Sequence, residues 1–448
     1  MIKISTLSKT LVVAALTAMA SVPVCAQWEH SLPQAFAQSV FVTSKGIVLA
    51  GDQNDYQEGG IFYSTDEGDT WSKSEIADKW WCRFFEAGDY VFAIAEYEPR
   101  IARSEDGGKS WTVMSYERVL ADIVSAKELP YLHSYAASYD SERNRIYMPI
   151  YSETAGVIYS DDFGETWKLT DRESLLIDWG DQKTMDNFYG STMFNGNFYA
   201  LGLYGLWKYD ADADKWDTVR DADGNIFNSN ALVSSIVRNG RFIAGHAAES
   251  TDASPEYLYS STDMVNFTPM PKPHYEVEGI PEGTDPLSWY VRAITQDDER
   301  IYTGLLYSQI FYSEDEGETW TFFSEGLPKW PYGYNIFQTN TISLAASENY
   351  LFSAQFSVDS NNGGIWRVKK PELGAAPSVI TDNSEVKYAN GVLSVTSGNA
   401  MIEVFALDGS RLLAAETDAL STASLPRGIY TYRAALPGRV LTGKIVVK

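Results

Sequence analysis

The sequence predicts an all-β protein, in which repeated small sheets are followed by a separate sandwich, and three observations support this. Seven successive units share one order: a strand of small residues, a turn, a strand with alternating aromatic and aliphatic residues, a loop and a closing strand. The aromatic residues that close these units lie about 40 to 56 residues apart, the period of four-stranded propeller blades. After residue 383, short alternating runs are separated by Asn-Gly, Asp-Gly and Pro-Gly turns. We therefore predict a seven-bladed β-propeller over 27–370, with six or eight blades as the alternative, a linker over 371–382 and an immunoglobulin-like sandwich over 383–448.

The first 26 residues have the features of a secretory signal peptide. Lys3 and Lys9 precede an apolar run, and a small residue, Ala26, stands at the expected cleavage site. The run is too short to span a bilayer, and we expect no transmembrane segment. A lipid-attachment site at Cys25 is the alternative, but Val24 before it fits such a site poorly.

The composition excludes several classes of partner. The chain carries a formal net charge of −25, so phosphate backbones and anionic membranes would repel it, and we expect no nucleic-acid partner. Cys82 is the one cysteine left after cleavage, so no internal disulfide can form, and its aromatic neighbours favour a buried thiol. The four histidines are scattered without zinc-ligand spacing. We predict no metal, no cofactor and a monomer.

One motif, Ser-x-Asp-x-Gly-x-Thr-Trp, recurs in four clear copies, with Ser in place of Thr in the second copy. The aspartate can accept backbone N–H groups across a tight turn, the glycine can adopt positive φ, and the tryptophan returns the chain to the sheet. The motif residues are Ser64, Asp66, Gly68, Trp71, Ser104, Asp106, Gly108, Trp111, Ser160, Asp162, Gly164, Trp167, Ser313, Asp315, Gly317 and Trp320. Degenerate copies lie at 210–216 and 261–267. The motif resembles the Asp-box (BNR) repeat of sialidases and related propellers. The resemblance implies a propeller in which the boxes are structural and remote from any chemistry.

The seventh unit, which ends at Arg367, lacks an outer strand. The segment from Trp28 to Pro33 echoes the segment from Trp320 to Pro328 that follows a box. We therefore predict that residues 28–33 complete the last blade and close the ring, which satisfies backbone groups that an open edge would expose.

The last 65 or so residues resemble the type A C-terminal sorting domain of type IX secretion cargo in Bacteroidota. The matching segments are Ile402–Gly409, Leu425–Tyr430 and Lys444–Lys448. The resemblance implies passage through the periplasm, recognition by the type IX machinery, and release or attachment at the outer surface, often with removal of the domain. The alternative is an ordinary immunoglobulin-like module that binds sugar or packs on the propeller.

A ligand is expected on the propeller face opposite the boxes, where the links between units are long and rich in aromatic residues beside carboxylates. Rings can stack on sugar C–H faces while polar groups bind hydroxyls; packing between blades is the alternative role for each ring. The residues predicted for this face are Trp80, Trp81, Tyr131, Trp179, Trp289, Tyr290, Trp330 and Tyr332.

Enzymatic alternatives depend on arginines and carboxylates. A sialidase needs an arginine triad for the sialate carboxylate; Arg83 and Arg292 could supply two members, but the early Arg-Ile-Pro is missing. Other glycoside hydrolases need two facing carboxylates, about 5–5.5 Å or 6.5–9.5 Å apart. The catalytic candidates among the carboxylates are Asp178, Asp181, Asp186 and Glu96.

The predicted function is a secreted cell-surface protein that binds glycan or protein without catalysis. A glycoside hydrolase of sialidase-like or endo-glucanase type and a purely structural surface protein are the alternatives.

Overall fold

The computed structural model describes residues 27–33, 37–52, 59–76, 81–95, 100–114, 131–132, 137–151, 156–178, 183–186, 188–202, 205–227, 232–246, 258–272, 291–305, 309–328, 340–356, 362–371, 386–389, 391–395, 398–406, 411–426, 428–436 and 439–447. Within these ranges the regular structure is β-strand, apart from one short 3-10 helix, η2 (Glu173–Leu175). None of the described segments forms a helix long and apolar enough to cross a membrane.

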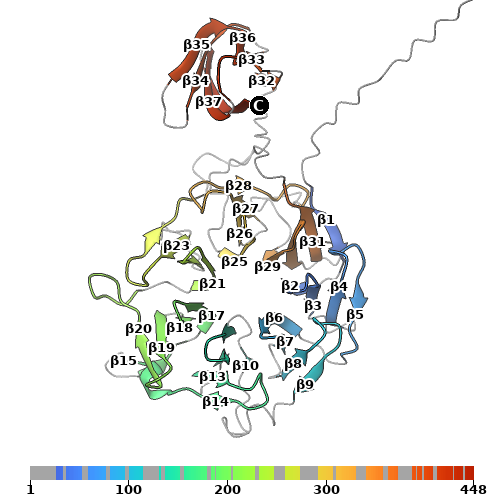
Figure 1. Cartoon of the computed structure of the whole chain (residues 1–448), viewed down its shortest axis with the longest axis vertical. Helices are drawn as coiled ribbons and strands as arrows, with labels where there is room; N and C mark the ends of the chain where they lie inside the picture. The colour runs from blue at the N-terminus through green and yellow to red at the C-terminus, as the bar shows by residue number, and fades with distance from the viewer. Residues whose placement is uncertain are drawn as a thin grey trace, which may run out of the picture.

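The described residues before 371 form seven antiparallel sheets around a common axis, and the fold is a β-propeller (Figure 1). Sheet 1 contains β2 (Ala37–Val42), β3 (Val48–Asp52), β4 (Gly60–Ser64) and β5 (Ser72–Lys73). Sheet 2 contains β6 (Trp81–Ala87), β7 (Tyr90–Ala95), β8 (Arg100–Ser104) and β9 (Thr112–Met114). Sheet 3 contains β10 (Tyr131–Leu132), β11 (Ser138–Asp140), β12 (Arg145–Tyr151), β13 (Gly156–Ser160) and β14 (Lys168–Leu169).

The remaining sheets repeat the same strand order. Sheet 4 contains β17 (Phe188–Phe194), β18 (Asn197–Gly202), β19 (Leu206–Asp210) and β20 (Lys215–Thr218). Sheet 5 contains β21 (Leu232–Arg238), β22 (Arg241–His246), β23 (Leu258–Ser261) and β24 (Thr268–Pro269). Sheet 6 contains β25 (Val291–Gln296), β26 (Ile301–Leu305), β27 (Ile310–Ser313) and β28 (Thr321–Phe322). Sheet 7 contains β29 (Asn340–Ala346), β30 (Tyr350–Phe356), β31 (Gly364–Lys369) and β1 (Glu29–Leu32). A separate hairpin, β15 (Leu176–Asp178) with β16 (Lys183–Met185), lies between sheets 3 and 4 in the chain.

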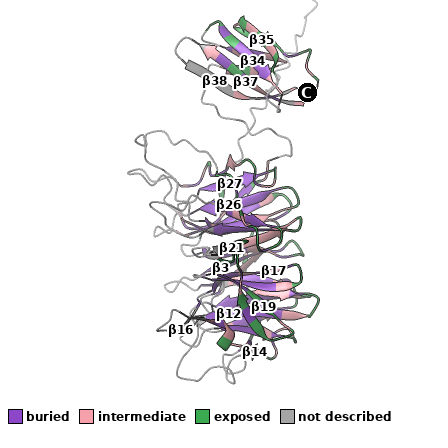
Figure 2. Ribbon diagram, turned by 90° about the vertical axis from the view of Figure 1, so that its left-hand side faces the viewer, coloured by how far each residue is buried: buried purple, intermediate pink, exposed green. Residues whose placement is uncertain are grey.

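The hydrophobic core is divided among the seams between neighbouring sheets, and Figure 2 shows buried residues along the strands of the propeller. Each seam holds one cluster of buried side chains drawn from the two sheets that meet there. At the seam between sheets 3 and 4, for example, Tyr147 stacks on Phe198 with ring centroids 4.4 Å apart. Burying aromatic side chains in this way is a main source of stability for the packed sheets.

The N-terminal strand closes the ring, and the prediction for residues 28–33 is confirmed. β1 pairs antiparallel with β31 and brings Glu29 opposite Arg367. Just before it, Trp28 is 3% exposed and donates its Nε1–H to the carbonyl of Phe323, 2.5 Å away. The first described strand therefore joins the last sheet, while the chain continues directly into sheet 1.

Each clear box forms the turn between the third and fourth strands of its sheet. In the first copy, Ser64 Oγ donates to Asp66 Oδ1 (2.7 Å) and accepts from Gly68 N (2.8 Å), while Thr70 N donates to Asp66 Oδ1 (2.9 Å). The same bonds recur in the other three copies. Gly68 has a φ of 86°, as the sequence predicts, and Glu67 before it also has a positive φ, 53°. The sequence did not indicate this second left-handed residue.

The C-terminal residues form a two-sheet sandwich. One sheet contains β32 (Val386–Ala389), β33 (Val392–Val395) and β36 (Ala419–Ser421); the other contains β34 (Ala400–Phe405), β35 (Arg411–Thr417), β37 (Gly428–Leu436) and β38 (Arg439–Val447). Leu393 from the first sheet and Ile402 from the second share one buried cluster. Tyr430 donates its hydroxyl to the carbonyl of Pro426 (2.8 Å), the bond of a tyrosine corner in immunoglobulin-like sandwiches.

Candidate functional site

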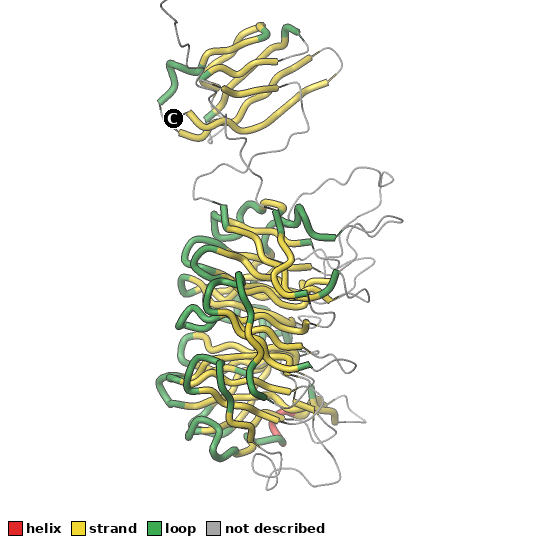
Figure 3. The backbone as a smooth tube through the Cα atoms, turned by 90° about the vertical axis from the view of Figure 1, so that its right-hand side faces the viewer, coloured by secondary structure: helices red, strands yellow, loops and turns green. Residues whose placement is uncertain are grey.

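The propeller has two faces. The box face carries the turns between first and second strands and between third and fourth strands; these turns line one side of the ring in Figure 3. The link face is the opposite one, at which the first strand of each sheet begins. The sequence places the ligand on the link face.

Six first strands are irregular at the same point, near the link face. Their pairing with the second strand shifts register once, by one residue, close to the start of the strand. The shifts lie between Ala37 and Ser39, Trp81 and Arg83, Phe188 and Gly190, Leu232 and Ser234, Val291 and Ala293, and Thr341 and Ser343. Bulges of this kind re-aim side chains and are common at barrel rims and near binding sites. In sheet 3 the first strand consists of two pieces, β10 and β11.

Arg83 and Arg292 lie at two of these bulges, and both are half-buried. Their strands, β6 and β25, are not neighbours in the ring: β2 and β29 separate them on one side, and the first strands of sheets 3, 4 and 5 on the other. The fold therefore places the two guanidinium-bearing residues in different parts of the channel wall.

Two further predicted residues are buried. Trp81 is fully buried in the cluster between sheets 1 and 2, and the absence of a side chain at Gly51 leaves room for its carbonyl. Asp186 is also fully buried, and its Oδ2 accepts the Nε1–H of Trp207 at 2.8 Å. For Trp81 and Asp186, this burial favours a packing role over direct contact with a ligand.

For two other candidates, Tyr131 and Asp178, the structure gives the strand pairing alone. Tyr131 begins β10 and pairs with Tyr151, and Asp178 ends β15 and pairs with Lys183. The remaining predicted residues lie outside the described ranges: Glu96, Asp181, Trp80, Trp179, Trp289, Tyr290, Trp330 and Tyr332.

Several arginines instead bind across seams on the box face. Arg103 of sheet 2 donates to the Phe163 carbonyl (2.9 Å) and pairs with Glu165 (2.9 Å) in the box of sheet 3. Arg238 of sheet 5 donates to Glu316 Oε1 (2.7 Å) in the box of sheet 6. Because these guanidinium groups hold neighbouring sheets together, they are committed away from the link face. The sequence reasoning missed this role. For Arg103 the signal was an arginine in the strand before a box, whereas Arg238 ends the first strand of its sheet, where no motif marks it.

The described residues bring no group of three or more potential metal ligands together.

Comparison with protein families finds the BNR/Asp-box repeat at residues 62–73 and 158–169, which are the first and third boxes. No curated protein matches the chain.

Comparison with solved structures finds propellers at low sequence identity. YCF48 bound to D1 peptide matches with a TM-score of 0.50 and 12% identity, over 78% of this chain and 97% of that chain. The extracellular domain of BT4673 from B. thetaiotaomicron matches with a TM-score of 0.50 and 10% identity, over 94% of this chain and 59% of that one. PorZ, a surface component of the type-IX secretion system of Porphyromonas gingivalis, matches with a TM-score of 0.48 and 11% identity, over 92% and 59%. At these identities the similarity concerns the fold.

Proposed function

We propose that this protein is a secreted, surface-located propeller that binds an extracellular glycan or protein, without catalysis, through its link face. The observation that carries the proposal is the set of bulges at one level of six first strands. Each bulge adds a residue to the channel wall at the end where the links begin, so the wall can present side chains that a regular strand would turn away.

The positions of charged residues favour binding over hydrolysis. A sialidase needs three arginines that converge on one carboxylate; Arg83 and Arg292 lie at two of the bulges, and the other four described bulges contain no arginine. Arg238 is engaged at a box-face seam. Other glycosidases need two facing carboxylates, and Asp186 is buried against Trp207.

A glycan array combined with a chromogenic-glycoside screen tests the proposal on the full secreted chain. We expect a restricted set of array ligands and no turnover above blank. Arg83→Ala and Arg292→Ala should each weaken binding, since both residues lie at the bulges. Arg145→Ala is the matched control, because Arg145 binds Asp161 on the box face at 2.6 Å and should leave binding unchanged.

Turnover that is lost on Asp178→Asn or Asp186→Asn would overturn the non-catalytic assignment and support a glycoside hydrolase. If neither Arg83→Ala nor Arg292→Ala changed the affinity for the ligand, the binding site would lie away from the bulges.

We also propose that the sandwich is the sorting domain that directs export of the propeller, with residues 1–26 as the signal peptide and the outer surface or the medium as the destination. The proposal is supported by the motif resemblance and by separate cores in propeller and sandwich. Deleting residues 383–448 should leave a folded propeller in the periplasm. If the truncated chain reached the surface as efficiently as the full chain, the sorting role would be wrong.

A further inference from the structure

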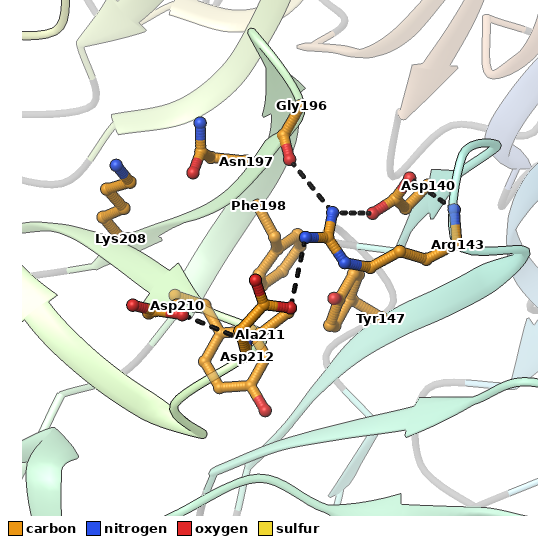
Figure 4. Close-up of a pocket in the computed structure, with 11 residues that line it drawn as sticks. Asp140, Arg143, Tyr147, Gly196, Asn197, Phe198, Lys208, Asp210, Ala211 and Asp212 are labelled. Atoms are coloured by element: carbon orange, nitrogen blue, oxygen red, sulfur yellow. Dashed lines mark hydrogen bonds and ion pairs between the residues drawn. The ribbon is translucent and has the colours of Figure 1, made fainter.

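A polar cavity of about 240 Å³ lies on the box face at the seam between sheets 3 and 4, distant from the bulges. Asp140 and Arg143 line it from the first turn of sheet 3, and Gly196 and Asn197 line it from the first turn of sheet 4 (Figure 4). Tyr147 on β12 and Phe198 on β18 also line the cavity, and the third strand of sheet 4 and the turn after it supply the rest, including Lys208, Asp210 and Asp212.

The cavity has a structural cause, which the other seams reveal. In five sheets the fourth residue of the box turn has positive φ and packs against the sheet before it. These residues, which we call plugs, are Glu67 (53°), Gly107 (79°), Phe163 (54°), Met264 (59°) and Glu316 (60°). The degenerate turn of sheet 4 has Ala213 at this point, and its left-handed residue is the next one, Asp214 (51°). The Asp214 carboxylate accepts the N–H of Asp171 (2.9 Å), in the segment after sheet 3, and does not line the cavity. No plug therefore packs against the first turn of sheet 3, and a cavity remains there.

Two of the plugs are carboxylates that bind the first turn of the preceding sheet. The Glu67 carboxylate accepts from Asn349 N (3.0 Å), from Asn349 Nδ2 (2.9 Å) and from Ser347 Oγ (2.5 Å). The Glu316 carboxylate accepts from Arg238 Nε (2.7 Å) and Asn239 Nδ2 (3.2 Å). At these seams the preceding sheet offers donors, and a glutamate fills the gap between the sheets.

The seam between sheets 3 and 4 has the donor but not the glutamate. Arg143 lies in the first turn of sheet 3, and the contacts of its guanidinium with described residues are all long: 3.3 Å to Asp140 Oδ2, 3.5 Å to the Gly196 carbonyl and 3.5 Å to Asp212 Oδ1. The Asp212 side chain is 88% exposed, so solvent surrounds it and it is a weak partner. Asp140 Oδ1 accepts the backbone N–H groups of Glu142 and Arg143 at 3.0 and 3.1 Å, and Asp140 Oδ2 is the oxygen that pairs with the Arg143 guanidinium.

We propose that this cavity binds the carboxylate of a small external ligand, which takes the place of the missing glutamate plug. The guanidinium of Arg143 can form a two-pronged pair with a carboxylate, in exchange for its long contact to Asp212. Lys208, Asn197 and Asp210 offer hydrogen bonds to hydroxyl groups on the same ligand. The ligand class is therefore a hydroxylated acid of monosaccharide size, such as a hexuronate. The site goes beyond the link-face function and stands independently of it.

Calorimetric titration of the full chain at low salt with sodium glucuronate, glucose, acetate and glutamate tests the proposal. Glucuronate should bind at one site and glucose should not, because the neutral sugar has no partner for Arg143. Arg143→Gln should weaken glucuronate binding at least about tenfold, as expected for loss of a charged hydrogen-bonding partner. Arg143→Lys, which keeps the charge but loses the fork, should give an intermediate loss.

Arg145→Gln is the matched control, since it removes one positive charge two residues away and Arg145 is not itself a lining residue of the cavity. Its affinity for glucuronate should equal that of the wild type, and thermal melting verifies that each variant is folded. Retained glucuronate binding in Arg83→Ala and Arg292→Ala proteins separates this site from the link face.

Equal affinity in wild-type and Arg143→Gln proteins, equal binding of glucose, or the absence of glucuronate binding would overturn the proposal. Glutamate binding tighter than that of glucuronate, with the same dependence on Arg143, would support the carboxylate site and assign its ligand to amino acids. Acetate binding as tight as that of glucuronate would overturn the role of the hydroxyl groups.

Discussion

Arg367 Nη2 lies 2.6 Å from Asp69 Oδ1 and so joins the last sheet of the ring to the box of the first. The same guanidinium donates to the Glu67 carbonyl and to Glu29 on β1, and it stacks over Tyr350 with its carbon 4.6 Å from the ring centroid. Arg103 repeats this arrangement between sheets 2 and 3, over Tyr90 at 4.7 Å. In both cases one arginine binds the carbonyl of the fourth box residue and the carboxylate of the sixth.

Arg367→Gln should destabilise the protein more than Arg103→Gln does. Arg367 is 8% exposed and binds two carboxylates, so its loss should cost about 2–3 kcal/mol. Arg103 pairs with one carboxylate within a seam whose sheets follow each other in the chain, and its loss should cost about 1–2 kcal/mol. Urea unfolding of both variants measures the difference. If both variants lost the same free energy of unfolding, the arginine at the closing seam would stabilise the protein no more than the one at the seam between sheets 2 and 3.

Removing the Trp28 side chain should open the ring. The Trp28→Ala substitution leaves a cavity between sheets 6 and 7 and leaves the Phe323 carbonyl without its donor, at a cost of about 3–5 kcal/mol. Faster proteolysis of the N-terminal segment should accompany the loss. Trp28→Phe, which fills most of the volume but cannot donate, should recover part of the stability. If Trp28→Ala melted like the wild type, β1 would not be the closing element.

Gly68 should tolerate substitution poorly for two reasons. Its φ is 86°, and a Cβ there would lie 2.6 Å from Ser31 Oγ and 2.9 Å from Phe352 Cε1 on the neighbouring sheet. Gly46 has a similar φ, 75°, but open space around it. Gly46→Ala should therefore cost about 1 kcal/mol, the price of the left-handed conformation. Gly68→Ala should cost at least about 2 kcal/mol, and thermal melting of the pair isolates the contribution of the contact between sheets.

The box aspartates should contribute to acid unfolding. Hydrogen bonds from the Thr70 hydroxyl, the Thr70 N–H and Ser64 lower the pKa of Asp66 to about 2. An unfolded aspartate has a pKa of about 3.9. The stability that Asp66 provides is therefore complete above that value and is lost as the pH falls towards 2. Asp66→Asn should reduce the urea midpoint at pH 7 and have a smaller effect near pH 2.5. An equal reduction at both pH values would contradict this account.

His30 should make the closing strand sensitive to mild acid. Its ring stacks on Trp366 (4.4 Å) and its Nε2 lies 2.7 Å from the Gly363 carbonyl. Burial lowers the pKa of His30 below its ordinary value, 6.5, although the hydrogen bond to Gly363 acts in the opposite direction. The unfolded chain therefore takes up a proton first, and stability falls as the pH drops below 6.5. His30→Phe keeps the stacking without titrating, so its melting temperature should fall less between pH 7.5 and 5.5. Parallel pH profiles would show that His30 does not contribute.

The repeated turns were predictable because the residues that form a box are local in sequence. Asp66 binds Thr70, four residues away, and Gly68 supplies its own positive φ, so composition and spacing are enough. The closing strand was also predictable, because Trp28 and Leu32 repeat the pattern of another segment of the chain. In contrast, the plug role of Glu67 depends on Ser347 and Asn349, which are distant in sequence.

The candidate site was less predictable for the same reason. Trp81 and Asp186 have the side chains of a ligand site, but both are buried under neighbouring strands, which no local pattern indicates. Arg143 belongs to no sequence motif. Its role could be inferred only from the structure, by comparing its seam with the other seams, where a plug residue fills the corresponding space.

The sequence by itself determined the strands, the box turns and the partner of the N-terminal strand, since each of these follows from short-range spacing, turn chemistry and an internal repeat. Only the tertiary structure decided which side chains face a seam, the channel wall or solvent. That choice is set by how neighbouring sheets pack against each other, and the residues that meet at a seam are separated by a whole repeat or, at the closing seam, by almost the whole ring.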